Sequence, residues 1–138
     1  MKNSLQTLTR IQKFNIDEQR KLLTEQLTRE DELIKALADL NWQFEQEKEF
    51  SRTYSAPGDF GLYVKKYMAA RDDLETRITA VRQKIAAIRE VIADLFKEQK
   101  TYEIVDDNRR RAAQKEIDAK EQKMLDEIGT NTYIKHKQ

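Results

Sequence analysis

The feature that most constrains the fold is a run of aliphatic side chains in the second half of the chain. Its members are separated by alternating steps of four and three positions: Leu74, Ile78, Val81, Ile85, Ile88, Ile92 and Leu95. The same spacing continues in both directions, through Phe60, Val64 and Tyr67 before the run and Gln99 and Tyr102 after it. A repeat of about 3.5 residues keeps one stripe of an α-helix facing a partner helix. The sequence therefore predicts a left-handed coiled coil.

The only strong interruption of the helical pattern is Ser-Ala-Pro-Gly-Asp-Phe, at residues 55–60. Pro57 disfavours a helical conformation at the preceding residue, Gly58 has a permissive backbone, and Asp59 can cap the helix that follows. A weaker helical pattern of leucine and isoleucine precedes the break, and Gly129 is a candidate C-cap.

We therefore predict an all-α fold, a long two-helix antiparallel coiled-coil hairpin whose second helix projects beyond the first. A single coiled-coil domain is expected over residues 1–138. Its helices are expected at about 2–53 and 60–128, with a turn at about 54–59 and a polar tail at 129–138.

The register of the hairpin can be tested within the chain. If the chain folds back at the break, residues that face each other have numbers that add to about 111, because both helices rise equally per residue. Phe44 then faces Tyr67, and the polar Gln12 faces the polar Gln99. This agreement favours a hairpin within one chain. An intermolecular coiled coil that uses the same stripes remains the alternative.

The second helix is longer than the first. Pairing is exhausted near residue 109, so about 20 residues extend beyond the hairpin as a single helix. They carry Arg109, Arg110 and Arg111 and a narrow apolar stripe made of Ile117, Met124, Leu125 and Ile128. An isolated helix of this length is only marginally stable in water. We therefore expect the projecting helix to bind something outside the chain.

Composition argues against several classes of function. Basic and acidic residues number 26 and 25, so the net charge of +1 provides no general attraction to nucleic acid or to an anionic membrane. Cysteine is absent, and the single histidine, His136, lies in the polar tail, so we expect neither a metal site nor a catalytic base. Without a phosphate-binding loop or an enclosed pocket, we expect no enzyme activity and no cofactor. The lack of a long apolar run and of a signal-type N-terminus predicts a soluble, cytoplasmic protein.

Two clusters keep more than one interpretation. The arginines at 109–111 are either a solvated face balanced by nearby acidic residues or a contact for an acidic partner, with nucleic acid as the weakest option. Seven aromatic residues lie around the break: Trp42, Phe44, Phe50, Tyr54, Phe60, Tyr63 and Tyr67. These side chains either close the end of the hairpin or form a docking surface at its tip.

Three stretches of the chain resemble the FliJ family, the small coiled-coil proteins of flagellar type III export. SLQTLTRIQKFNIDEQRKLLTEQL is similar to the family's opening helix, and YMAARDDLETRITAVRQKI is similar to the start of its second helix. AKEQKMLDEIG resembles the family's C-terminal pattern, in which Gln122, Lys123, Asp126 and Glu127 occupy the matching positions. The chain departs from the family in lacking an aromatic pair near the N-terminus and in having a polar run there, made of Gln12, Asn15 and Gln19.

The resemblance implies a non-enzymatic central stalk of the flagellar export apparatus. Such a stalk enters the hexameric flagellar export ATPase, promotes its assembly and activity, links it to the cytoplasmic domain of the membrane export gate, and escorts export chaperones. The residues expected to bind the ATPase ring are Arg109, Arg110, Arg111, Ile117, Gln122, Lys123, Met124, Asp126 and Glu127. The residues expected to dock the tip on the gate are Trp42, Tyr63, Tyr67 and Leu74. The implied location is the cytoplasmic face of the export apparatus, with membrane contact only through partners.

Two alternatives remain at this point. The same hairpin can serve as a chaperone or adaptor that holds export substrates or their chaperones without acting on the ATPase, with the aromatic tip as its working surface. The equivalent stalk of a virulence-type secretion apparatus has the same residue pattern. Binding to nucleic acid is not expected from a charge-balanced coil.

Overall fold

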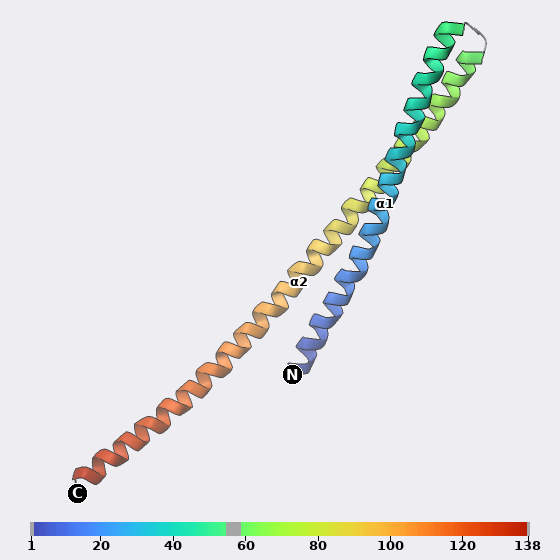
Figure 1. Ribbon diagram of the computed structural model, residues 1–138. Coiled ribbons are helices and arrows are strands. Elements are labelled where there is room, and N and C mark those ends of the chain that lie inside the picture. The colour runs from blue at the N-terminus through green and yellow to red at the C-terminus, as the bar shows by residue number, and fades with distance from the viewer. Residues whose placement is uncertain (1, 55–58, 138) are drawn as a thin grey trace. The chain divides into compact units, whose positions relative to one another are not determined.

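The protein consists of two long helices in the computed structural model, which describes residues 2–54 and 59–137 (Figure 1). Helix α1 spans Lys2–Tyr54, and helix α2 spans Asp59–Lys137. No strand is present in these two ranges, which confirms the predicted all-α fold of two long helices packed against each other. Most of the predicted turn, residues 55–58, lies outside the described residues.

The chain forms two compact units, and each contains a segment of both helices. The inner unit comprises Phe14–Leu95, and the terminal unit comprises Met1–Lys13 together with Phe96–Gln138. The units are described separately below.

The core of the inner unit is the predicted aliphatic stripe. Ile78, Val81 and Ile85 of α2 are buried, and so is Ile16 of α1, with exposed fractions between 3% and 6%. Half-buried residues extend this core along α1 in steps of three and four positions: Gln19, Leu23, Gln26, Glu30, Leu33, Leu37, Leu40 and Phe44. Both helices therefore bury one narrow stripe each, as heptad spacing dictates.

The register of the hairpin agrees with the fold-back arithmetic. In the inner unit the rings of Phe44 and Tyr67 stack with centroids 4.0 Å apart, as predicted. Glu30 of α1 forms an ion pair of 3.1 Å with Arg82 of α2. Long-range pairs within one chain, at the predicted register, place the partner stripes in the same molecule and support the hairpin.

The terminal unit contains a polar pair close to the predicted register. Gln12 is buried, and its side-chain Nε2 donates to Oε2 of Glu98, the neighbour of the predicted partner Gln99. The amide of Gln12 thus finds an acceptor one position away from the predicted partner.

The predicted end of the second helix is wrong. We expected Gly129 to cap the helix and residues 129–138 to form a polar tail, but α2 continues through Gly129 to Lys137. The single proline of the chain is Pro57, so nothing beyond Gly129 forces the helix to stop. A glycine inside a helix costs only about 1 kcal/mol relative to alanine, which the following residues offset.

Candidate partner-binding surfaces

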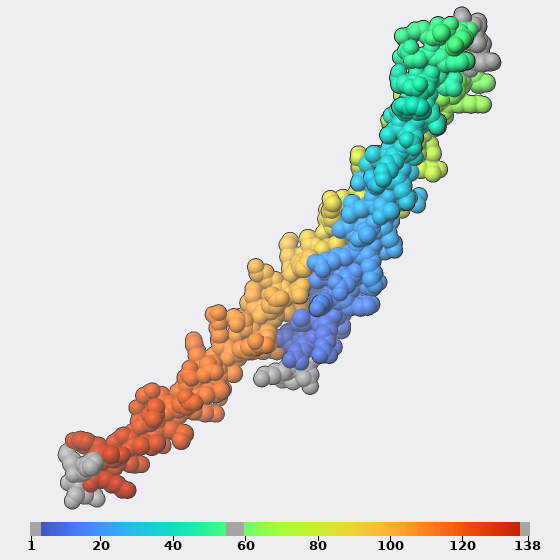
Figure 2. Space-filling view, in the orientation of Figure 1, coloured from blue at the N-terminus to red at the C-terminus, as the bar shows by residue number. Residues whose placement is uncertain are grey.

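In the terminal unit, α2 continues past the end of its contact with α1. Leu5 of α1 is half-buried, and the last half-buried residues of α2 are Val105 and Asp106. From Asp107 to Lys135 every residue is exposed, and we call this range the exposed segment. Figure 2 shows no other helix over the red part of α2 on the face in view. The second helix therefore projects beyond the first, as predicted.

An apolar stripe runs along the exposed segment. Ile117, Met124, Leu125 and Ile128 are exposed by 49%, 62%, 61% and 57% respectively. Ile117, Met124 and Ile128 are seven and four positions apart, so they lie on the same face of the helix. Bulky side chains arranged along one face, with about half or more of their surface in solvent, are typical of a surface that binds a partner.

The charged residues near the start of the exposed segment pair within the helix. Arg110 and Asp106 approach to 3.0 Å, and Arg111 and Asp107 approach to 3.2 Å. These are exposed pairs one turn apart, and each contributes only about 0.3–0.5 kcal/mol. The locally paired interpretation therefore fits Arg110 and Arg111. Arg109 differs, because it has no hydrogen bond or ion pair within the described residues.

The residues carried over from the family's C-terminal pattern all lie on the exposed segment. Gln122 donates from Nε2 to Oδ1 of Asp126 at 3.1 Å, and both side chains are on the surface. Lys123 and Glu127 are exposed and form no ion pair within the range that the structure describes. Successive helical residues point about 100° apart, so these four side chains span an arc of about 140° on the side of the helix away from Ile117, Met124 and Ile128.

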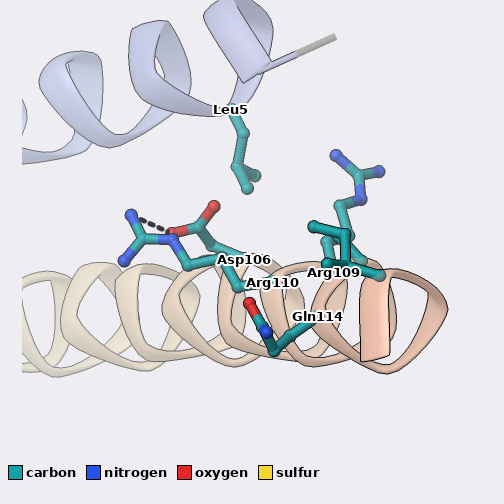
Figure 3. Close-up of a pocket in the computed structure, with 7 residues that line it drawn as sticks. Leu5, Asp106, Arg109, Arg110 and Gln114 are labelled. Carbon is teal, nitrogen blue, oxygen red and sulfur yellow. Dashed lines mark ion pairs between the residues drawn. The ribbon is translucent and has the colours of Figure 1, made fainter. Parts of the chain in front are cut away.

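A hollow lies where α1 begins alongside α2 (Figure 3), and sequence reasoning did not identify it. We call it the terminal notch. Its volume is about 480 Å³, and its walls include Leu5, Asp106, Arg109, Arg110, Ala113 and Ile117. In Figure 3 the side chain of Leu5 points from α1 towards Asp106 and Arg110 on α2, whereas Arg109 rises beside the hollow. Leu5 and Asp106 have numbers that add to 111, so the predicted register already placed these two wall residues opposite each other.

The aromatic residues of the inner unit divide into two groups. Phe44 lies against three rings of α2, with centroid distances of 6.2 Å to Phe60, 6.3 Å to Tyr63 and 4.0 Å to Tyr67. The Tyr67 hydroxyl donates to Oδ1 of Asn41 at 2.6 Å. Tyr63 and Tyr67 are therefore half-buried packing residues, consistent with closing this end of the coiled coil.

The other aromatic side chains of the inner unit face solvent. Trp42 is 64% exposed, Phe50 is 58% exposed and Tyr54 is 69% exposed, and the centroids of the Phe50 and Tyr54 rings lie 4.7 Å apart. Leu74 is half-buried in the stripe of α2. Of the four predicted tip residues, Trp42 is thus the one whose side chain is most available to a partner.

Arg71 occupies a position in the stripe where an apolar side chain is usual. Its guanidinium lies 5.6 Å from the centre of the Tyr67 ring and 3.4 Å from Asp72, while its Nε is buried and has no partner in the part of the chain that the structure describes. Burial disfavours the charge of Arg71, but the hydrogen bond and negative charge of Asp72 outweigh it and raise the pKa of the guanidinium. Arg71 therefore stays charged, and it contributes ring and ion contacts rather than an apolar layer.

Neither a metal site nor a membrane span is found in the described part of the chain. Residues 2–54 and 59–137 contain no group of three or more histidine, cysteine, aspartate or glutamate side chains that could hold a metal ion. In the same ranges no helix combines the length and the apolar character that crossing a bilayer requires.

Comparison with known proteins identifies the family. The family model of the flagellar FliJ protein matches residues 1–138, which is the whole chain. No curated protein and no solved structure matches significantly. Together with the two-helix fold and the long exposed end of α2, this match shows that the chain belongs to the FliJ family of flagellar export components.

Proposed function

We propose that this protein acts as the central stalk of the flagellar export apparatus, with the exposed segment of α2 bound inside the hexameric export ATPase. The observation that carries the proposal is the exposure of every residue from Asp107 to Lys135, combined with the apolar stripe along that range. A lone helix of this length gains little stability from its own hydrogen bonds, so contact with a partner is needed to hold it rigid.

The distribution of side chains on the exposed segment supports a partner that surrounds the helix. The apolar stripe occupies one face, while Gln122 and Asp126 lie near the opposite face. A ring of six subunits meets a single helix on all sides and can contact it only unequally. Charged and amide side chains suit such contacts, because they allow the ring to shift around the helix without breaking one deep apolar contact.

In this proposal the stalk promotes the assembly of the ATPase ring and its activity. A helix that contacts several subunits at once stabilises the closed ring over separate subunits, because a ligand that binds only the assembled form shifts the equilibrium towards it. The inner unit then links the ATPase to the cytoplasmic domain of the export gate, with the exposed Trp42 as the anchor we expect to matter most.

The proposal is tested by mixing the purified protein with the export ATPase of the same genome. We expect faster ATP hydrolysis and a larger hexamer fraction in sedimentation experiments. Met124→Ser combined with Ile128→Ser should reduce both effects, since it removes half of the exposed apolar stripe. Trp42→Ala is the matched control, because it removes an equally exposed apolar side chain from the inner unit. No response of the ATPase to the wild-type protein would refute the proposal.

The exposed aromatic residues support a second candidate, a chaperone or adaptor that holds export substrates or their chaperones without acting on the ATPase. Trp42, Phe50 and Tyr54 offer apolar surface that the helices themselves do not bury. For this role, Trp42→Ala should abolish capture of export chaperones, while the double serine variant should retain it. The Trp42 substitution is preferable to changes at Tyr63 or Tyr67, because those two side chains pack on Phe44.

A further inference from the structure

The terminal notch combines aliphatic wall residues with the guanidinium of Arg109, which has no partner among the described residues. Leu5 of α1 and Ala113 and Ile117 of α2 contribute aliphatic surface to its walls. Ala113 is the smallest of these side chains, so the helix leaves room at the centre of the hollow. The volume of about 480 Å³ falls within the range of about 300–1,000 Å³ usual for ligand pockets. One bulky side chain fits such a space, whereas a whole helix does not.

The charges around the notch favour an acidic group beside that side chain. Asp106 and Arg110 neutralise each other across 3.0 Å. Arg109 also lines the notch, and it has no hydrogen bond or ion pair within the described residues. Its guanidinium can bind a carboxylate through two parallel hydrogen bonds. A phosphate-rich partner fits less well, because it brings more negative charge close to Asp106 and Asp107 than a single carboxylate does.

We propose that the terminal notch receives a bulky apolar side chain from a loop of the export ATPase, while Arg109 binds a carboxylate adjacent to that side chain. This inference rests on the proposed stalk function and adds a second, specific contact at the base of the exposed segment. Because Leu5 contributes one wall, the contact requires α1 as well as α2. The loop therefore recognises the hairpin at the point where its two helices part.

The sequence offers closely matched variants for a test with the full-length protein. Ala113→Leu fills the notch from within, whereas Ala112→Leu makes the same change on a neighbouring alanine that does not line it. Arg109→Gln removes the cation beside the notch, whereas Arg77→Gln removes an exposed cation of the inner unit that already pairs with Asp73. All four positions are exposed on α2, so we expect equal helicity and thermal stability by circular dichroism.

The readout is the dissociation constant for the export ATPase, measured by fluorescence anisotropy. Ala113→Leu and Arg109→Gln should each weaken binding roughly tenfold or more, as expected for loss of a buried side-chain contact or of a charged hydrogen bond. Ala112→Leu and Arg77→Gln should change it less than about threefold. A photo-reactive side chain at Gln114, which also lines the notch, should cross-link to an ATPase peptide with a large apolar residue next to aspartate or glutamate.

The outcomes separate this inference from the function on which it rests. If the ATPase binds the wild-type protein and the two members of each pair behave alike, the notch contact is refuted and the stalk function stands. A cross-linked peptide without an acidic residue beside an apolar one also overturns the notch contact. If the ATPase does not bind the wild-type protein at all, both proposals are refuted.

Discussion

Gln26 is the position where a substitution should stabilise the hairpin most clearly. Its side chain lies in the stripe of α1, opposite Ile85 in the fold-back register, and Ile85 is only 4% exposed. The Oε1 atom of Gln26 is buried and has no hydrogen-bond partner among the described residues. A buried acceptor of this kind costs about 1–3 kcal/mol relative to a hydrogen-bonded one.

Replacing Gln26 by leucine removes that cost and adds apolar contact with the aliphatic stripe of α2. No side-chain hydrogen bond within the described residues is lost, because the side chain of Gln26 makes none. Glutamine and leucine have similar helix propensities, so the change acts through packing. Since Gln26 is only half-buried, we expect a gain of about 1–2 kcal/mol and a rise in melting temperature of roughly 2–6 °C.

Thermal and urea unfolding followed by circular dichroism at the helical minimum measures this gain. Gln83→Leu is the control, since Gln83 is exposed on α2 and the same substitution there should change stability by less than about 0.5 kcal/mol. Gln12→Leu should gain less than Gln26→Leu, because Gln12 donates a hydrogen bond to Glu98. An unchanged or lower melting temperature for Gln26→Leu would show that its amide is not an unsatisfied group in the coiled coil.

Two further predictions concern the aromatic cluster and the end of α2. Phe44→Ala should destabilise the hairpin by about 2–3 kcal/mol in urea unfolding, because Phe44 contacts three rings of α2, whereas Phe50→Ala should cost less than about 1 kcal/mol. Equal losses would contradict the packing role of Phe44. Gly129→Ala should raise helicity and slow amide exchange over residues 130–137, because a Cβ at Gly129 meets nothing within 4 Å and alanine favours the helix by about 0.5–1 kcal/mol. Reduced helicity in this variant would instead indicate a helix cap at Gly129.

The stripe spacing and the single break at Pro57 are enough to predict two long helices and the register in which they pair. Heptad spacing is a local property of each helix. Because both helices rise equally per residue, the position of one break fixes which residues of the two helices face each other. This is why the Phe44–Tyr67 contact and the exposed end of α2 could be predicted. Gly129 could not be assigned correctly, because the same glycine fits a helix interior or a cap, and its neighbours determine which one forms.

The contacts of individual side chains, by contrast, depend on the tertiary structure. Three consecutive arginines look alike in sequence, yet Arg110 and Arg111 pair one turn back while Arg109 faces the terminal notch. The seven aromatic residues likewise divide between the stack on Phe44 and solvent. The physical reason is that periodicity specifies which face of a helix is buried. Ion pairing, ring stacking and the shape of a hollow also depend on where the second helix begins and ends and on the directions of its side chains.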